Sequence, residues 1–308
     1  MVIRDGAVSA SMARTNPRPR GSTMKFGIIP INIGTRSLDH LARTAQRAEE
    51  LGFESVWTFE HVIVPLDYES KYPYSNSGKM GAAPETPFID PLIALTAVAA
   101  STKQIRLGTG VNILSQTNPL LMAKQVASID YLSGGRMMLG VGIGWLEEEF
   151  DAMGVPFKRR GACFDDYVQA MRKVWSGETV EHGSEFLSWH GFKSYPVPVQ
   201  KPLPVIMGGA KGKIYERIAR YGDGWFVPSG NPADLGAKLA ELKAACAAEG
   251  RRFEEIEITC MWPGVGGVDG ARALREAGVD RVVMPLQAFG ADQAAGMQKV
   301  SEEIIARM

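Results

Sequence analysis

The feature that most constrains the fold is a repeated alternation of short apolar segments with longer segments of helical character. It begins near Met24 and continues to the C-terminus. Short apolar runs bounded by turn residues are typical of buried strands, and the intervening segments have the length and apolar spacing of helices. The eight predicted strands span residues 25–30, 55–60, 106–111, 137–143, 204–207, 224–227, 257–261 and 281–285.

This order of elements predicts an α/β protein with a parallel sheet. Near-continuously apolar strands separated by helices indicate a sheet covered by helices, and eight such units indicate closure into a (β/α)8 TIM barrel. The alternative is an open doubly wound sheet. The glycine pattern of dinucleotide-binding sheets is missing after the first strand, where residues 30–34 read Pro-Ile-Asn-Ile-Gly. The barrel is therefore the predicted fold.

Two insertions interrupt the alternation. Residues 62–87 are rich in Pro, Gly and Tyr and show no period. A loop of this length in a compact domain is usually functional or disordered, and because it directly follows His61 we expect a lid over a site. Residues 178–201 are predicted to form an inserted β-hairpin, with Gly183 and Gly191 as turn candidates.

Residues 1–23 differ from the rest of the chain. They carry several arginines among small and turn-forming residues and have no apolar core long enough for a signal peptide. We expect a disordered N-terminal extension followed by a single barrel domain over residues 24–308. The three cysteines, Cys163, Cys246 and Cys260, are odd in number and widely spaced, which suits a reducing cytoplasm.

The charge balance argues against polyanionic partners. The chain has 34 basic and 34 acidic residues among 308, with no basic run, so neither nucleic acid nor an anionic membrane is expected as a partner. Its longest apolar window, residues 88–100, contains an Asp-Pro pair and is too short to span a bilayer. A small-molecule substrate is the expected partner.

In a barrel, the residues just past each strand meet at one mouth. This set contains no paired histidines, no carboxylate cluster at ligand spacing and no cysteine pair, so no metal site is expected. No Ser or Cys stands in an elbow motif, which argues against acyl transfer. Glycine, aromatic surface and one imidazole suit a flat organic cofactor. The set is Asn32, Glu60, His61, Gly110, Val111, Asn112, Gly142, Gly144, Trp145, Gly208, Gly209, Ser229, Trp262 and Gln287.

Two positions in this set have both a functional and a structural interpretation. His61 is a candidate acid-base group, but a histidine at the end of a strand can also serve only as a cap. Gly208, Gly209 and Ala210 precede a predicted helix, so their backbone amides could hold a phosphate with Lys211 and Lys213 nearby. A tight turn that needs glycine only for its geometry fits the same spacing equally well.

Four blocks in order resemble the luciferase-like flavin and deazaflavin oxidoreductases, most closely the branch that depends on coenzyme F420. The resemblance covers roughly Met24 to the C-terminus. The blocks are AEELGFESVWTFEH at residues 48–61, IRLGTGV at 105–111, GGRMMLGVGIGWLEEEF at 134–150 and QKPLPVIMGGAKGKIYERIARYGDGW at 200–225.

The resemblance implies roles for individual residues. His61 would lie beside the deazaflavin ring as the acid-base or substrate-anchoring group, with Glu60 as the acid before it. Gly208 and Gly209 would hold the cofactor phosphate. The Gly110–Val111 bond would be a non-prolyl cis peptide that bulges against the ring. We assign catalysis to His61 and Glu60, and cofactor binding to Gly110, Val111, Asn112, Gly142, Gly144, Trp145, Gly208, Gly209 and Ala210.

The chain departs from its relatives at Trp145. Sugar-phosphate dehydrogenases of the family have a catalytic Glu at this position, so their substrate and acid-base scheme cannot be assigned to this chain. Glu147 and Glu149 lie nearby, where we expect them to stabilise the first turn of a helix.

The predicted function is hydride transfer between coenzyme F420 and an organic substrate. The alternatives are an FMN-dependent luciferase-like monooxygenase and a non-catalytic deazaflavin carrier. A homodimer that packs through the Ala-rich helix at residues 93–100 is also expected, although the same helix could instead pack on its own barrel.

Overall fold

The structure is a computed structural model, which describes residues 23–228 and 230–308. The extension predicted for residues 1–23 lies outside the described residues except for Thr23, and so does Ser229 of the predicted mouth. No helix in the described part of the chain is both long and apolar enough to cross a membrane.

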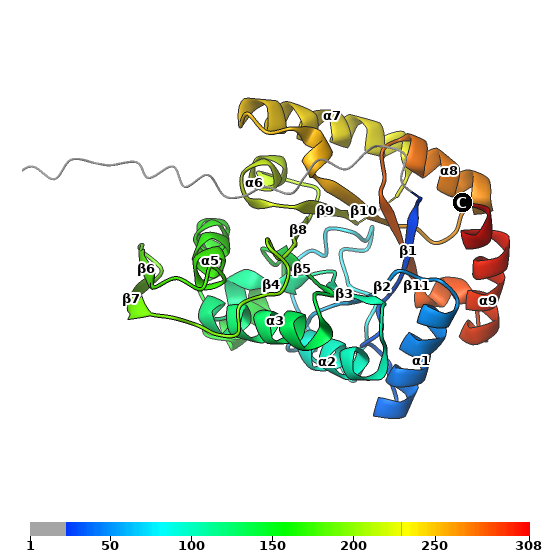
Figure 1. The fold of residues 1–308 in the computed structure, drawn as a ribbon, viewed down its shortest axis with the longest axis horizontal. Helices are drawn as coiled ribbons and strands as arrows, with labels where there is room; N and C mark the ends of the chain where they lie inside the picture. Colours follow the sequence, from blue (N-terminus) through cyan, green and yellow to red (C-terminus); the bar gives the residue numbers. More distant parts are fainter. Residues whose placement is uncertain (1–22, 229) are drawn as a thin grey trace, which may run out of the picture.

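Eight parallel strands close into a barrel, as the alternation predicts. Strand β1 pairs with both β2 and β11, and the pairing of β3 with β5 closes the ring. Figure 1 shows the ring of strands inside a ring of helices. The barrel strands are β1 (Lys25–Ile29), β2 (Ser55–Thr58), β3 (Arg106–Thr109), β5 (Met137–Gly142), β8 (Val205–Gly208), β9 (Gly224–Val227), β10 (Glu257–Met261) and β11 (Arg281–Pro285).

Helices cover the outside of the barrel, and local signals set several of their starts. The side chain of Asn118 accepts hydrogen bonds from the amides of Leu120 and Leu121 and so caps the start of α3. The helices are α1 (Leu38–Glu50), α2 (Pro91–Ser101), α3 (Pro119–Ser133), α4 (Glu147–Ala152), α5 (Arg160–Val174), α6 (Ile214–Tyr221), α7 (Pro232–Ala248), α8 (Gly267–Glu276) and α9 (Gln293–Glu303).

The second and third predicted strands are too long, and the second ends at Thr58. The third strand ends at Thr109, because a cis peptide at Gly110–Val111 interrupts it before the short strand β4 (Asn112–Ile113). Helix α5 begins at Arg160. Its first turn contains a glycine, and its N-cap residue Arg159 makes no side-chain capping bond, so the sequence carries no start signal there.

The predicted β-hairpin is present. Strands β6 (Val180–Gly183) and β7 (Ser188–Phe192) pair antiparallel and project away from the barrel (Figure 1). The Ser184 amide donates to the carbonyl of Leu187 at 2.8 Å, so the turn lies between the strands. Gly191 lies within β7, so its prediction as a turn residue is wrong. The Ser184 hydroxyl, which accepts from the amides of Phe186 and Leu187, supplies the turn chemistry instead.

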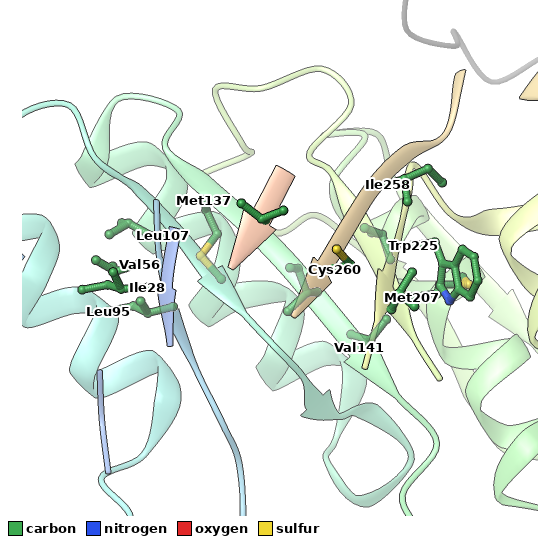
Figure 2. Close-up of a cluster of buried hydrophobic side chains, with 14 of the residues drawn as sticks. Ile28, Val56, Leu95, Leu107, Met137, Val141, Met207, Trp225, Ile258 and Cys260 are labelled. Carbon is green, nitrogen blue, oxygen red and sulfur yellow. The ribbon is translucent and has the colours of Figure 1, made fainter. Parts of the chain in front are cut away.

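Apolar side chains pack on both faces of the barrel sheet. The main core lies between strands and helices, and Figure 2 shows part of it, including Ile28, Val56, Leu107 and Trp225. A smaller cluster inside the barrel contains the fully buried Trp57. Gly108 stands beside Trp57 in register, and a β-carbon there would come within 2.5 Å of the indole. The barrel interior is thus filled, which leaves its mouth for chemistry.

Candidate active site

His61, which follows β2, is held by a glutamate from α4. Its Nδ1 lies 3.0 Å from Oε2 of Glu149, and the two side chains are only 12% and 2% exposed. Oε1 of the same carboxyl accepts from the amides of Val62 and Ile63 at 2.6 and 3.2 Å. Glu149 does lie in the first turn of α4, as expected, but its side chain also has a role that the sequence does not predict, because its oxygens bind His61 and the first two amides of the 62–87 segment.

Glu149 is ionised at neutral pH. Burial alone would raise the pKa of its carboxyl, but the hydrogen bond and charge of His61 and the two backbone amides outweigh burial, so the pKa is lowered. An ionised carboxylate accepts hydrogen bonds at both oxygens. The imidazole of His61 thus has a fixed, negatively charged partner on its Nδ1 side.

Glu60 points to a different part of the site. Its Oε1 accepts from Nδ2 of Asn112 at 2.6 Å, and its Oε2 accepts from the amide of Ile113. Burial raises the pKa of Glu60 to about 7; these two hydrogen bonds oppose the shift, and the charges of Asp90 and Glu149 add to it. The observed contacts give Glu60 a positioning role for the residues after the bulge, and its catalytic role remains a prediction.

Val111 projects between two of the predicted cofactor-binding glycines. The Gly110–Val111 bond is cis, as the resemblance implies. An ideal β-carbon on Gly142 would lie 2.7 Å from Val111 Cγ2, and one on Gly208 would lie 2.7 Å from Val111 Cγ1. Both glycines are therefore required by packing around the bulge. Val111 itself is half-buried at the mouth.

Gly144 also has a packing reason for lacking a side chain. Its φ is +79°, and a β-carbon would come within 2.5 Å of the Phe150 ring. The guanidinium of Arg160 donates from Nε to the Gly144 carbonyl at 3.2 Å. This turn places Trp145 next to His61, with their ring centroids 5.9 Å apart.

The 62–87 segment, which the sequence predicts to be a lid, packs against Trp145, the neighbour of His61. Tyr68 and Tyr72 lie with their ring centroids 5.8 and 5.1 Å from that of Trp145. Oε1 of Glu148 accepts from the amides of Glu69 and Ser70 at 2.7 and 3.2 Å. Helix α4 holds the segment by polar contacts, and Trp145, two residues before the helix, holds it by aromatic contacts. We call residues 62–87 the lid segment.

The turn after β8 is the place that best fits an anionic group. In the described part of the chain, no hydrogen bond uses the backbone N–H of Gly209, Ala210 or Lys211, and α6 begins just beyond them. Gly209 has φ +130°, and its carbonyl accepts from Nε1 of Trp225 at 2.8 Å. Free amides before a helix N-terminus suit a phosphate, so Gly209 and Ala210 can hold one. Gly208, which the resemblance also predicts to hold the phosphate, packs against the side chain of Val111.

Polar atoms without partners lie close to the bulge. Among the described residues, Oδ1 of Asn112 and Oγ1 of Thr58 are buried without a hydrogen bond. Buried polar atoms are normally paired, so the surroundings of the bulge offer polar contacts to a bound group. Residues 23–228 and 230–308 contain no cluster of three or more His, Cys, Asp or Glu side chains that could hold a metal.

The fold and this mouth define a TIM-barrel protein with a histidine–glutamate pair and a glycine-flanked bulge. Residues 12–303 match the model of the luciferase-like monooxygenase family. An uncharacterized protein of Mycobacterium tuberculosis is 33% identical over 211 residues, 68% of this chain and 74% of that protein. A second one is 32% identical over 240 residues, 78% and 82% of the two chains. The chain belongs to the luciferase-like monooxygenase family.

Solved structures share the fold. The coenzyme F420-dependent tetrahydromethanopterin reductase of Methanopyrus kandleri aligns with TM-score 0.74 and 19% identity, covering 93% of this chain and 99% of that one. An F420-dependent secondary alcohol dehydrogenase in complex with an F420–acetone adduct has TM-score 0.73 and 16% identity, covering 93% and 99%. The monooxygenase RslO1 of Streptomyces bottropensis has TM-score 0.70 and 23% identity, covering 92% and 99%.

Proposed function

We propose that the protein is an oxidoreductase that moves a hydride between coenzyme F420 and a small organic substrate. The observation that carries this proposal is the pairing of His61 with an ionised Glu149 at the mouth of a luciferase-like barrel. A histidine side chain can serve as a general acid or a general base. Hydride transfer to or from a hydroxyl-bearing carbon requires such a proton exchange.

The residues around the bulge fit a flat cofactor with a phosphate. When bound, the deazaflavin would supply the hydride acceptor or donor. Val111 would support the ring face, and the free amides of Gly209 and Ala210 would hold the phosphate. The remaining predicted contacts are Gly110, Asn112, Gly142, Gly144, Trp145 and Gly208, of which Gly142, Gly144 and Gly208 would act mainly by leaving room for neighbouring side chains.

An FMN-dependent monooxygenase is the second candidate. The name of the family and the structural similarity to a monooxygenase support it. The two candidates differ in the cofactor and in the need for oxygen, whereas the proposed role of His61 is common to both. A deazaflavin carrier without catalysis is the third candidate, and it would bind the cofactor without oxidising or reducing any substrate.

An anaerobic redox assay tests the proposal. Protein loaded with oxidised F420 is mixed with a panel of small alcohols, and the absorbance of the cofactor is followed; loaded with reduced F420, it is mixed with the matching carbonyl compounds. We expect reduction or oxidation with at least one pair and its loss in His61→Ala. Binding without any redox change across the panel would favour the carrier. Turnover only in a separate aerobic assay with reduced FMN would favour the monooxygenase.

We also propose that the protein forms a homodimer through α2. Ile93 on this helix is 68% exposed, although Leu92, Leu95 and Val98 are buried against the protein's own barrel. Sedimentation of the wild type and of Ile93→Asp tests the proposal. A dimer that the substitution dissociates is expected, and a monomeric wild type would contradict it.

A further inference from the structure

The carboxylate of Glu149 serves two different sets of donors. Oε2 is 3.0 Å from the His61 ring, and Oε1 accepts from two consecutive backbone amides, those of Val62 and Ile63. An ionised carboxylate can only accept hydrogen bonds. The contact with Oε2 therefore requires a proton on Nδ1 of His61. In the neutral imidazole the other nitrogen, Nε2, is then the unprotonated one.

We propose that Glu149 is a positioning residue that fixes His61 in the Nδ1–H tautomer and couples it to the seating of the lid segment. Nε2 is thereby the atom that exchanges the proton with the substrate. The inference deepens the proposed function and rests on it for the chemical role of Nε2, but the tautomer itself is a property of the protein alone.

The coupling to the lid follows from the chain connectivity. Val62 and Ile63 directly follow His61, so one side chain holds both the imidazole and the root of the lid segment. The rings of Phe88 and Trp145 stand edge-on to the imidazole, with centroids 5.7 and 5.9 Å away. If Val62 and Ile63 move away, Glu149 loses two hydrogen-bond donors, and we expect water to reach the imidazole of His61.

Two further acidic groups lie near the pair, and the guanidinium of Arg160 binds the Gly144 carbonyl, next to Trp145. Besides Glu149 itself, Glu60 follows β2, and Asp90, the N-cap of α2, acts electrostatically on Glu60. Phe88 and Trp145, the other neighbours that contact the imidazole ring, carry no charge. The pH dependence of kcat is therefore measured in the wild type and in Glu60→Gln. An effect that comes from titration of Glu60 is absent from the variant.

The substitution Glu149→Gln is expected to change the tautomer of His61. A glutamine has one oxygen and one NH2 group in place of two oxygens. Two backbone amides need the oxygen, so the NH2 group must face Nδ1 of His61. Nδ1 then becomes an acceptor, and the imidazole changes to the Nε2–H tautomer, which cannot take up a proton at Nε2. Glu148→Gln is the matched control, because Glu148 also accepts from lid amides, those of Glu69 and Ser70, and makes no hydrogen bond to His61.

The tautomer is read by ¹⁵N NMR of the histidine rings in the full-length protein without cofactor, with His61→Asn used to assign the signals. We expect Nδ1–H in the wild type and in Glu148→Gln, and Nε2–H in Glu149→Gln. Retention of Nδ1–H in Glu149→Gln, or Nε2–H in the wild type, overturns the proposal. Should Glu149→Gln fail to fold, the wild-type spectrum alone still decides.

Kinetics add a second measurement where a substrate is in hand. A wrong tautomer at a catalytic histidine has lowered kcat by about 10⁴-fold in a serine protease. We expect Glu149→Gln to lower kcat by at least about 100-fold with little change in KM, and Glu148→Gln to lower it less than about fivefold. Equal losses in the two variants would overturn the positioning role. Because the NMR test needs no cofactor, failure to bind F420 would refute the proposed function without touching the tautomer.

Discussion

Val111 Cγ1 occupies the space into which a side chain on Gly208 would project: an ideal β-carbon on Gly208 would lie only 2.7 Å away. The two residues come from opposite sides of β5, one after β3 and one at the end of β8. A β-carbon contact below 3.0 Å requires one of the partners to move. Gly208 thus has a structural role whether or not it also touches a cofactor.

This contact predicts coupling between the two positions. We expect Gly208→Ala to lower the free energy of unfolding by about 1–3 kcal/mol, the usual cost of overpacking. In a Val111→Ala background the methyl groups that clash are gone, so the same substitution should cost less than about half as much. Urea unfolding of the four proteins gives the coupling energy. Strictly additive costs would mean that the side chains do not meet.

A second prediction concerns the turn that can hold a phosphate. Gly209 has φ +130°, which side chains rarely adopt, and its amide has no hydrogen-bond partner among the described residues. Gly209→Val should destabilise the fold by about 1–3 kcal/mol and weaken cofactor binding by more than about tenfold, or about 1.4 kcal/mol. Lys211→Ala should cost less affinity, and its effect should grow as salt falls. Folded Gly209→Val that binds cofactor normally would rule out the phosphate role.

His61→Ala tests the catalytic centre. Positioned acid-base groups typically contribute about 10²–10⁴-fold to rate, so turnover should fall at least about a hundredfold while cofactor affinity changes little. His40 on α1 and His190 on the hairpin are the comparison substitutions, because neither lies at the mouth. Steady-state kinetics and a binding titration make the measurement. Unchanged turnover would reduce His61 to a strand cap.

The raised pKa of Glu60 predicts that the free energy of unfolding depends on pH. Its pKa rises from 4.5 to about 7 on folding, so the folded protein holds a proton that the unfolded chain has released between these values. The contribution of Glu60 to the free energy of unfolding is therefore complete below about pH 4.5 and falls as pH rises through about 7.

Glu60→Gln should remove this dependence. A flip of the Asn112 amide would let the new NH2 group donate to Oδ1 of Asn112, which has no partner at present, while the oxygen still accepts from Ile113. The Tm of the variant relative to the wild type should rise between pH 5 and pH 8, as measured by calorimetry. A Tm difference that does not vary with pH would mean that Glu60 does not titrate in this range.

The sequence predicts the barrel and the place of His61 because both follow from local pattern. Periodicity identifies each strand, and a residue after a barrel strand must lie at the mouth. The hydrogen bond between His61 and Glu149 joins residues 88 positions apart, and no spacing rule connects them. In the same way, the sequence predicts Gly142 and Gly208 as cofactor contacts. The structure shows that both also have to be glycine because the methyl groups of Val111, from a third segment of the barrel, pack against them.

We propose that this mouth binds a deazaflavin. The most direct measurement is an equilibrium titration of the purified full-length protein with coenzyme F420 and, in the same buffer, with FMN, following tryptophan fluorescence. Trp145 lies next to His61 and is expected to report binding. We predict saturable quenching by F420 at least about tenfold tighter than by FMN, a difference of about 1.4 kcal/mol. Tight binding of FMN with none of F420 would contradict the account and move the protein to the FMN-dependent monooxygenases.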